Sequence, residues 1–153
     1  MELSAREDIE APLDQVYAAL TDFDTIERQV MRRGIEIRRT KDTGSDLEGM
    51  AWSGQFAFRG KQRQVAIELK ECQAPEHLVF STISGGLEGH SDVELVALSR
   101  ARTRINVKTT LAPKTLSARL LVQSLKLARG NIEKRFRNRM GLMAKELETR
   151  LRS

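Results

Sequence analysis

The alternation of apolar and polar residues predicts one strand and two short helices at the start of the chain. Residues 3–9 alternate as a half-buried strand does, and Glu7 is the one charged exception on its inner face. Pro12 interrupts this pattern, and proline is favoured at the first position of a helix. A second short helix follows and ends before Gly34.

From residue 35 to residue 111 the hydrophobic period is two, which predicts strands. Short turn-forming segments, such as Asp42–Ser45 and Gly85-Gly86, separate six apolar segments, so six consecutive strands form an antiparallel meander. The apolar positions of these strands are Ile35, Ile37, Met50, Trp52, Phe56, Phe58, Val65, Ile67, Leu69, Leu78, Phe80, Val93, Leu95, Ile105, Val107 and Leu111.

After Pro113 the period lengthens to three or four residues, which predicts one long helix to the end of the chain. Its apolar stripe consists of Leu121, Leu125, Ala128, Ile132, Phe136, Met140, Met143, Leu147 and Leu151. Gly130 and Gly141 lie within this helix, and each costs about 1 kcal/mol of helix propensity relative to alanine. They therefore mark either a bend or the close approach of another element.

The composition is that of one globular domain, which we place at residues 1–153. Hydrophobic residues make up 40% of the chain and charged residues 31%. The first residues do not resemble a signal peptide, and no long uncharged apolar segment occurs, so a cytoplasmic location is predicted. Cys72 is the only cysteine and has no Cys or His at ligand spacing, so we expect no metal and no cofactor.

Charge divides the chain in two. Residues 1 to 99 hold 11 basic and 18 acidic residues, whereas residues 100 to 153 hold 15 basic and 3 acidic residues. Such a basic segment favours an anionic partner, but opposite charges on neighbouring strands explain much of the pattern equally well. On the second interpretation, Arg102, Arg104 and Lys108 pair with acidic residues of the preceding strand.

The order of the elements, together with the segment DIEAPLDQVYAALTDF at residues 8–23, resembles the START-like superfamily, also called the helix-grip or SRPBCC superfamily. Its bacterial members include proteins of the polyketide cyclase/dehydrase and lipid transport types. The resemblance implies an α+β helix-grip fold, with a curved seven-stranded antiparallel sheet around a long C-terminal helix and two short helices after the first strand. It also implies an apolar cavity between sheet and helix. Unlike many relatives, this chain has no tryptophan in the second short helix, where residues 25–28 read Thr-Ile-Glu-Arg.

Side-chain parity identifies the residues that would line such a cavity. The predicted ligand-binding residues are Trp52, Phe56, Phe58 and Phe80 on the sheet and Ile132, Phe136 and Met140 on the facing side of the helix. Ordinary core packing is the alternative for each of them. Trp52 is the sharpest candidate, because its buried N–H would need a partner such as a ligand oxygen.

Arg129 is the basic residue nearest the centre of the apolar helix sector, at about 100° per residue. An inward guanidinium would bind the carboxylate or phosphate head of a ligand. The alternatives are that its stem lies along apolar surface with its head in water, or that it pairs with Glu7.

The sequence contains no complete catalytic set, which favours a protein that is not an enzyme but leaves the question open. His77 follows a predicted turn and is expected at the surface, and His90 has the parity of an outward residue. Tyr17, Glu7 and Asp92 are conceivable acid–base groups, but their spacing does not single them out.

Three functional hypotheses follow. The first is non-enzymatic binding or carriage of a hydrophobic small molecule, such as a lipid, isoprenoid or polyketide, in the cavity. The second is a cyclase or dehydratase that uses the same cavity. The third is docking of the basic C-terminal helix on an anionic membrane or on the ribosome; aromatic residues are too few there to favour nucleic acid, and the sequence leaves the oligomeric state open.

Overall fold

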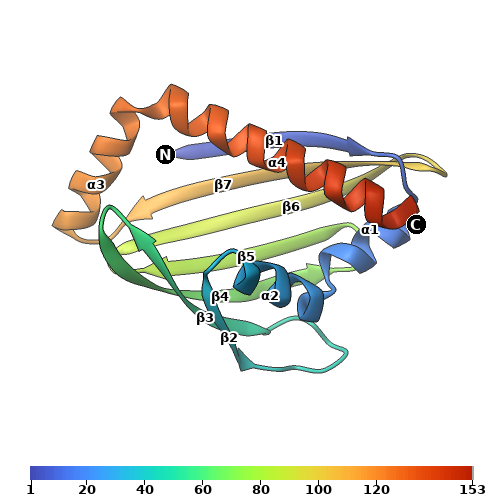
Figure 1. The fold of residues 1–153 in the computed structure, drawn as a ribbon, viewed down its shortest axis with the longest axis horizontal. Coiled ribbons are helices and arrows are strands. Elements are labelled where there is room, and N and C mark those ends of the chain that lie inside the picture. The colour runs from blue at the N-terminus through green and yellow to red at the C-terminus, as the bar shows by residue number, and fades with distance from the viewer. Residues whose placement is uncertain (153) are drawn as a thin grey trace.

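The computed structural model describes residues 1–152, so Ser153 of the predicted domain lies outside the described residues. One antiparallel sheet contains all seven strands in the order β1-β7-β6-β5-β4-β3-β2 (Figure 1). The strands are β1 (Glu2–Ile9), β2 (Glu36–Lys41), β3 (Ala51–Phe58), β4 (Lys61–Gln73), β5 (His77–Ser84), β6 (Leu87–Ser99) and β7 (Arg102–Pro113). The predicted fold class is confirmed: the chain forms a curved seven-stranded sheet with two short helices after β1 and a long C-terminal helix.

The two short helices are α1 (Leu13–Leu20) and α2 (Phe23–Arg32). Pro12 is the N-cap of α1, one residue before the first-turn position that the sequence suggested. The side chain of Asp22 accepts a hydrogen bond from the backbone N–H of Thr25, which satisfies one of the free donors at the start of α2. Asp22 therefore caps the start of α2.

The C-terminal segment differs from the single helix that its periodicity predicts. It forms α3 (Leu116–Leu127) and α4 (Arg129–Arg152), and the backbone of Ala128 between them is not helical. Figure 1 shows α3 standing across one end of the sheet, while α4 runs along β1 towards α1. The break follows from this arrangement, because the two apolar faces pack on parts of the sheet that no straight helix could cover together.

Of the two glycines in this segment, Gly130 lies just after the break and Gly141 marks a close approach. A Cβ atom at position 141 would lie 3.3 Å from Oε1 of Glu7 on β1. No heavy atom lies within 4 Å of the corresponding position at Gly130.

The core consists of two clusters at neighbouring places on the inner face of the sheet. The first joins β1, β6, α1 and α4 through Ile9, Ala11, Val16, Leu95, Ala144 and Leu147. The second joins α2 to β3, β4 and β5 through Phe23, Met50, Trp52, Leu69 and Leu78. Helix α4 thus packs against the β1 side of the sheet, and α2 covers the Trp52 side.

The basic residues of β7 pair mainly with β1 rather than with β6, which corrects the cross-strand pairing suggested by the sequence. Arg104 Nε lies 2.8 Å from Asp8 Oδ1, and Arg102 approaches the carboxylates of Asp8 and Glu10. The Arg104 hydrogen bond lowers the pKa of Asp8 below its ordinary value, against the opposing effect of burial. The sequence order suggested β6 as the partner, but β7 lies between β1 and β6 and its charges face both neighbours.

Candidate functional site

An apolar pocket of about 340 Å³ lies between the β1 side of the sheet and the helices α1, α2 and α4. Its floor consists of small and branched side chains of the strands, and its walls come from the helices. The apolar lining residues are Ala5, Val93, Ile105 and Val107 on the strands and Ala19, Leu20, Ile26, Val30, Met140, Met143, Ala144 and Leu147 on the helices. A volume of this size falls within the range of small-molecule sites.

The rim of this pocket is polar. Gln29 of α2 and Arg33, the C-cap residue of that helix, line the rim together with Glu146 and Arg150 of α4. The closest approach between Arg33 and Glu146 is 4.0 Å, and their side chains are 47% and 64% exposed. Such an exposed ion pair contributes little to stability. The Arg33–Glu146 ion pair is therefore a weak contact at the rim.

Glu7 is the one charged residue on the pocket floor. Its position in β1 gives it the same face as Leu3, Ala5 and Ile9, as the alternation predicts. It lies opposite Ile105 in the register of β1 and β7. The sequence identified Glu7 as an exception on the inner face, and the structure places it against α4.

Tyr17 and Cys72 form a second polar contact on the inner side of the molecule. The Tyr17 hydroxyl lies 3.1 Å from Cys72 Sγ, and Tyr17 packs against both core clusters. Burial and the hydrogen bond to Cys72 raise the pKa of Tyr17 to about 12. The tyrosinate is therefore harder to form than that of an ordinary tyrosine, so the Tyr17 hydroxyl suits hydrogen bonding better than proton abstraction.

We expect the tyrosinate absorbance of the folded protein to titrate near pH 12 instead of the ordinary value of about 10. Because the chain has one tyrosine, the ultraviolet titration reports Tyr17 alone. A pKa raised by folding means that the contribution to stability is present below about pH 10 and is lost as the pH rises towards 12. Circular dichroism at each pH would show that the protein is still folded; a midpoint near 10 in folded protein would contradict this environment for Tyr17.

Trp52, the leading candidate of the sequence, belongs to the second core cluster. It is 5% exposed and its ring meets Phe23 edge to face, with 4.8 Å between centroids. Its indole N–H donates to Glu27 Oε2 over 2.9 Å, and Glu27 in turn pairs with Arg39. The partner of the Trp52 N–H is thus a side chain of α2. This is the helix in which many relatives have a tryptophan and this chain has none.

The predicted phenylalanines Phe56, Phe58 and Phe80 are half-buried, and none of them lines the apolar pocket. Phe58 lies at the end of β3, where the guanidinium groups of Arg59 and Arg63 are 5.4 and 5.6 Å from its ring centroid. Arg59 also donates to Ser124 Oγ of α3. This end of the sheet is therefore closed by cation–π contacts and by α3.

The four residues predicted on the C-terminal helix have different surroundings. Met140 lines the pocket, whereas Ile132 and Phe136 are half-buried on α4 outside it. Arg129 is 61% exposed and its Nε donates to Glu133 Oε1 at 3.0 Å, so its guanidinium lies at the surface of the helix end. We predicted that α4 packs against β3, but in the structure it packs along β1.

Sequence reasoning missed the contribution of α1 and α2 to the pocket. Ala19, Leu20, Ile26 and Val30 line it, although the sequence assigned both helices only a place after the first strand. The signal was present in their apolar residues, but a periodicity does not say which part of a sheet a helix covers.

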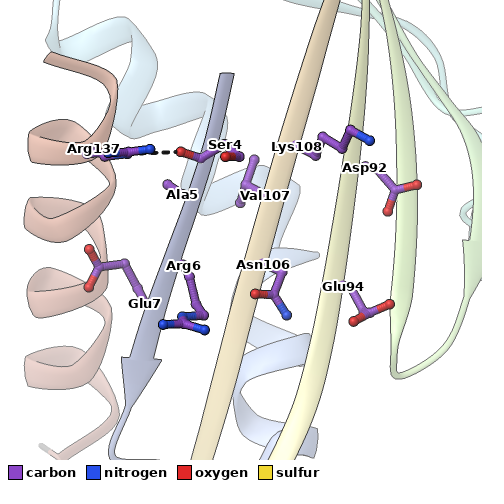
Figure 2. A pocket seen from close by; sticks show the side chains of 10 residues that line it. All are labelled: Ser4, Ala5, Arg6, Glu7, Asp92, Glu94, Asn106, Val107, Lys108 and Arg137. Atoms are coloured by element: carbon purple, nitrogen blue, oxygen red, sulfur yellow. Dashed lines mark hydrogen bonds between the residues drawn. The ribbon is translucent and has the colours of Figure 1, made fainter. Parts of the chain in front are cut away.

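The outer face of β1, β7 and β6 carries an open depression of about 680 Å³ with mixed charges (Figure 2). Figure 2 shows Arg6, Asn106 and Glu94 as one row across the strands and Ser4, Lys108 and Asp92 as another. His77, expected at the surface, is part-buried beside this face, and its Nε2 lies 2.7 Å from Asp92 Oδ1. Asp92 is thus engaged on the outer face, away from the pocket, while His90 is exposed as expected.

Within residues 1–152, no three His, Cys, Asp or Glu side chains are grouped as a metal site requires. None of the helices in that part of the chain combines the length and apolar character needed to cross a membrane.

Comparison with solved structures identifies the fold. The chain is similar to the Zhui aromatase/cyclase from Streptomyces sp. R1128, with a TM-score of 0.69, 13% identity, and coverage of 100% of this chain and 96% of that one. It is similar to TTHA0849 from Thermus thermophilus, with a TM-score of 0.64, 19% identity, and coverage of 98% and 96%. A START superfamily protein from Mycobacterium smegmatis gives a TM-score of 0.59 at 10% identity, with coverage of 88% and 95%.

These similarities show that the chain has the START-like, helix-grip fold. No family model matches the sequence, and no curated protein matches it. The fold is therefore established by structure, while the function rests on the site itself.

Proposed function

We propose that this protein binds and carries a hydrophobic small molecule, and that the apolar pocket beneath α4 is its site. The observation that carries the proposal is the lining: twelve of the pocket residues are apolar, and they come from four different parts of the fold. An apolar ligand would gain stabilisation by leaving water for such a surface. Two methionines of α4, Met140 and Met143, give one wall a flexible surface that can adjust to ligand shape.

Carriage without chemistry is the form that the surroundings favour. Of the three conceivable acid–base groups, Tyr17 has a pKa raised to about 12 and Asp92 is engaged with His77 on the outer face, so Glu7 is the one that lines the pocket. The aromatase/cyclase with the same fold supports a cyclase or dehydratase as the alternative use of the pocket.

Native mass spectrometry of freshly purified protein, before and after extraction with organic solvent, tests the proposal. We expect an adduct that extraction removes, and one-to-one binding of the neutral fluorescent probe N-phenylnaphthylamine by the extracted protein. A protein that neither retains an apolar compound nor accepts the probe would contradict carriage. Release of a bound compound in chemically altered form would instead favour the enzymatic alternative.

Docking on an anionic membrane is a second candidate function, and the outer face of α3 favours it. Leu116, Leu120 and Leu127 are 73%, 59% and 92% exposed. At about 100° per residue they share one side of α3, opposite the buried Ala118 and Val122. One apolar face of α3 packs against the protein, and the opposite apolar face, which carries the leucines, is exposed and available to a partner.

The charge around these leucines favours anionic lipid as that partner. Residues 114–139 hold eight basic residues and one acidic residue. Arg119 and Lys126 flank the leucines, are exposed, and have no ion-pair partner among residues 1–152. A second copy of the chain would bring two such cationic faces together, whereas anionic lipid neutralises them.

Sedimentation with lipid vesicles tests this second candidate. We expect the protein to bind phosphatidylglycerol vesicles but not phosphatidylcholine vesicles at low salt, and to bind less as salt rises. Equal binding to both lipids, or binding to neither, would contradict it. The leucine face and the pocket use different residues, so either proposal can fail without the other.

A further inference from the structure

The unexplained feature of the apolar pocket is the carboxylate of Glu7. Four residues of β1 share the inner face of the sheet, and three of them are apolar: Leu3, Ala5 and Ile9. Glu7 stands between Ala5 and Ile9 on the pocket floor, opposite Ile105. A leucine or valine would fit the apolar pattern of this strand, so Glu7 gives the pocket floor a charge that the packing of the core does not require.

Helix α4 leaves room for this carboxylate at one position. Gly141 lies over Glu7, and a Cβ atom there would stand 3.3 Å from Oε1, tighter than ordinary contact. Figure 2 shows the Glu7 side chain pointing from β1 towards α4, whereas the side chain of the preceding residue, Arg6, lies over the β1 strand. Glycine in a helix costs about 1 kcal/mol relative to alanine. Gly141 therefore lowers the helix propensity of α4, and its lack of a side chain leaves the space above Glu7 open.

Within residues 1–152, the Glu7 carboxylate has neither a hydrogen-bond donor nor an ion-pair partner. Two cations that line the pocket or the outer depression with Glu7 have other partners. Arg137 donates its Nε–H to the carbonyl of Ser4 at 3.3 Å, and Arg33 faces Glu146. The half-buried Glu7 carboxylate therefore has no protein partner in the described part of the chain and can accept hydrogen bonds from a ligand.

Glu7 also lies where the pocket and the outer face of the molecule share lining residues. It lines both the apolar pocket and the depression on the outer face, at the seam between the edge strand β1 and α4. A molecule with an apolar body and a polar head would place its body on the pocket floor and its head at this seam. The head would then meet both Glu7 and water.

We propose that Glu7 recognises the head of the ligand, and that the ligand is a hydrophobic molecule carrying an amino group that is protonated at neutral pH. This inference rests on the proposed binding function and names its ligand class. An ammonium group donates up to three hydrogen bonds and carries the charge that Glu7 lacks nearby. A hydroxyl group would donate one neutral bond, and a carboxylate head would be repelled.

Competition between ligands of one chain length tests the inference without any variant. Dodecylammonium, dodecanol and dodecanoate would each displace N-phenylnaphthylamine from the extracted protein at neutral pH and low salt. We expect dodecylammonium to bind about tenfold more tightly than dodecanol. This ratio is at the low end of what a charge-assisted hydrogen bond contributes, because solvent weakens the interaction with the partly exposed Glu7. Dodecanoate should bind most weakly of the three.

The Glu7→Gln variant, which keeps the shape of the side chain, assigns the preference to Glu7. We expect the ratio of dodecylammonium to dodecanol affinity to fall to about one in this variant, because the amide has no charge. Glu10→Gln is the matched control, since Glu10 is an exposed carboxylate just after β1, and it should keep the wild-type ratio.

The outcomes separate the two proposals. Failure of wild-type protein to bind the probe or any of the three chains overturns the binding function, and the ligand class with it. Binding of all three with equal affinity, or a preference for ammonium that persists in Glu7→Gln, overturns the role of Glu7 alone.

Discussion

Replacing Ala19 with phenylalanine should weaken the binding of N-phenylnaphthylamine by between about tenfold and a hundredfold. Ala19 is a half-buried residue of α1 that lines the apolar pocket. A benzyl group at this position would project into the space that the ligand needs, and α1 would have to move to make room. Fluorescence titration of the extracted protein gives the affinity, and urea unfolding shows how much stability the variant has lost.

The neighbouring residue provides the matched control. Ala18 lies on the same helix but is exposed, so Ala18→Phe adds the same group with the same effect on helix propensity outside the pocket. We expect this variant to bind the probe as the wild type does. Equal affinities of the Ala19→Phe and wild-type proteins would show that the probe binds elsewhere, and the pocket would lose its assignment.

Replacing Leu116, Leu120 and Leu127 together with glutamine should lower the affinity for phosphatidylglycerol vesicles at least about a hundredfold. Each leucine that leaves water for the lipid interface contributes about 1.5 kcal/mol or more, so the three together dominate the attraction of the charges. Glutamine has nearly the helix propensity of leucine, so α3 should remain helical. Vesicle sedimentation at low salt gives the affinity, and circular dichroism gives the helix content.

A second triple variant controls for the general loss of exposed hydrophobic surface. Met31, Val96 and Leu98 are 50%, 39% and 41% exposed and lie on α2 and β6, away from α3. Their replacement with glutamine should leave vesicle binding close to that of the wild type. If both triple variants bind equally well, the leucine face of α3 has no part in docking, and the basic residues alone account for the attraction.

The elements were predictable because each is encoded by local periodicity. The period of two in the middle of the chain gives the six strands of the meander, and the parity of Glu7 gives its inward position. The breaks at Pro12 and Gly34 are equally local, since each depends on the backbone preference of one residue. The sequence did not decide between a bend and a close approach at Gly141, because helix propensity is equally unfavourable for glycine in both cases.

The site was less predictable, because lining a pocket is a property of two elements at once. Trp52 and Met140 are both inward residues of their own elements, but α4 packs along β1 and α2 covers Trp52. The Trp52 N–H therefore donates to Glu27 of α2. Arg129 fell in the apolar sector of a straight helix, and the break at Ala128 places it at an exposed helix end instead.

By itself, the sequence determined the order and type of the elements, which side of each element is apolar, and that Glu7 interrupts an apolar face. These properties depend on residues a few positions apart, where side-chain period and backbone preference act. The tertiary structure alone decided where α4 crosses the sheet, that α1 and α2 complete the pocket, and that Gly141 stands over Glu7. The contacts of α4 with β1 join residues more than one hundred positions apart, and all of these contacts follow from the packing of whole surfaces, which no local pattern specifies.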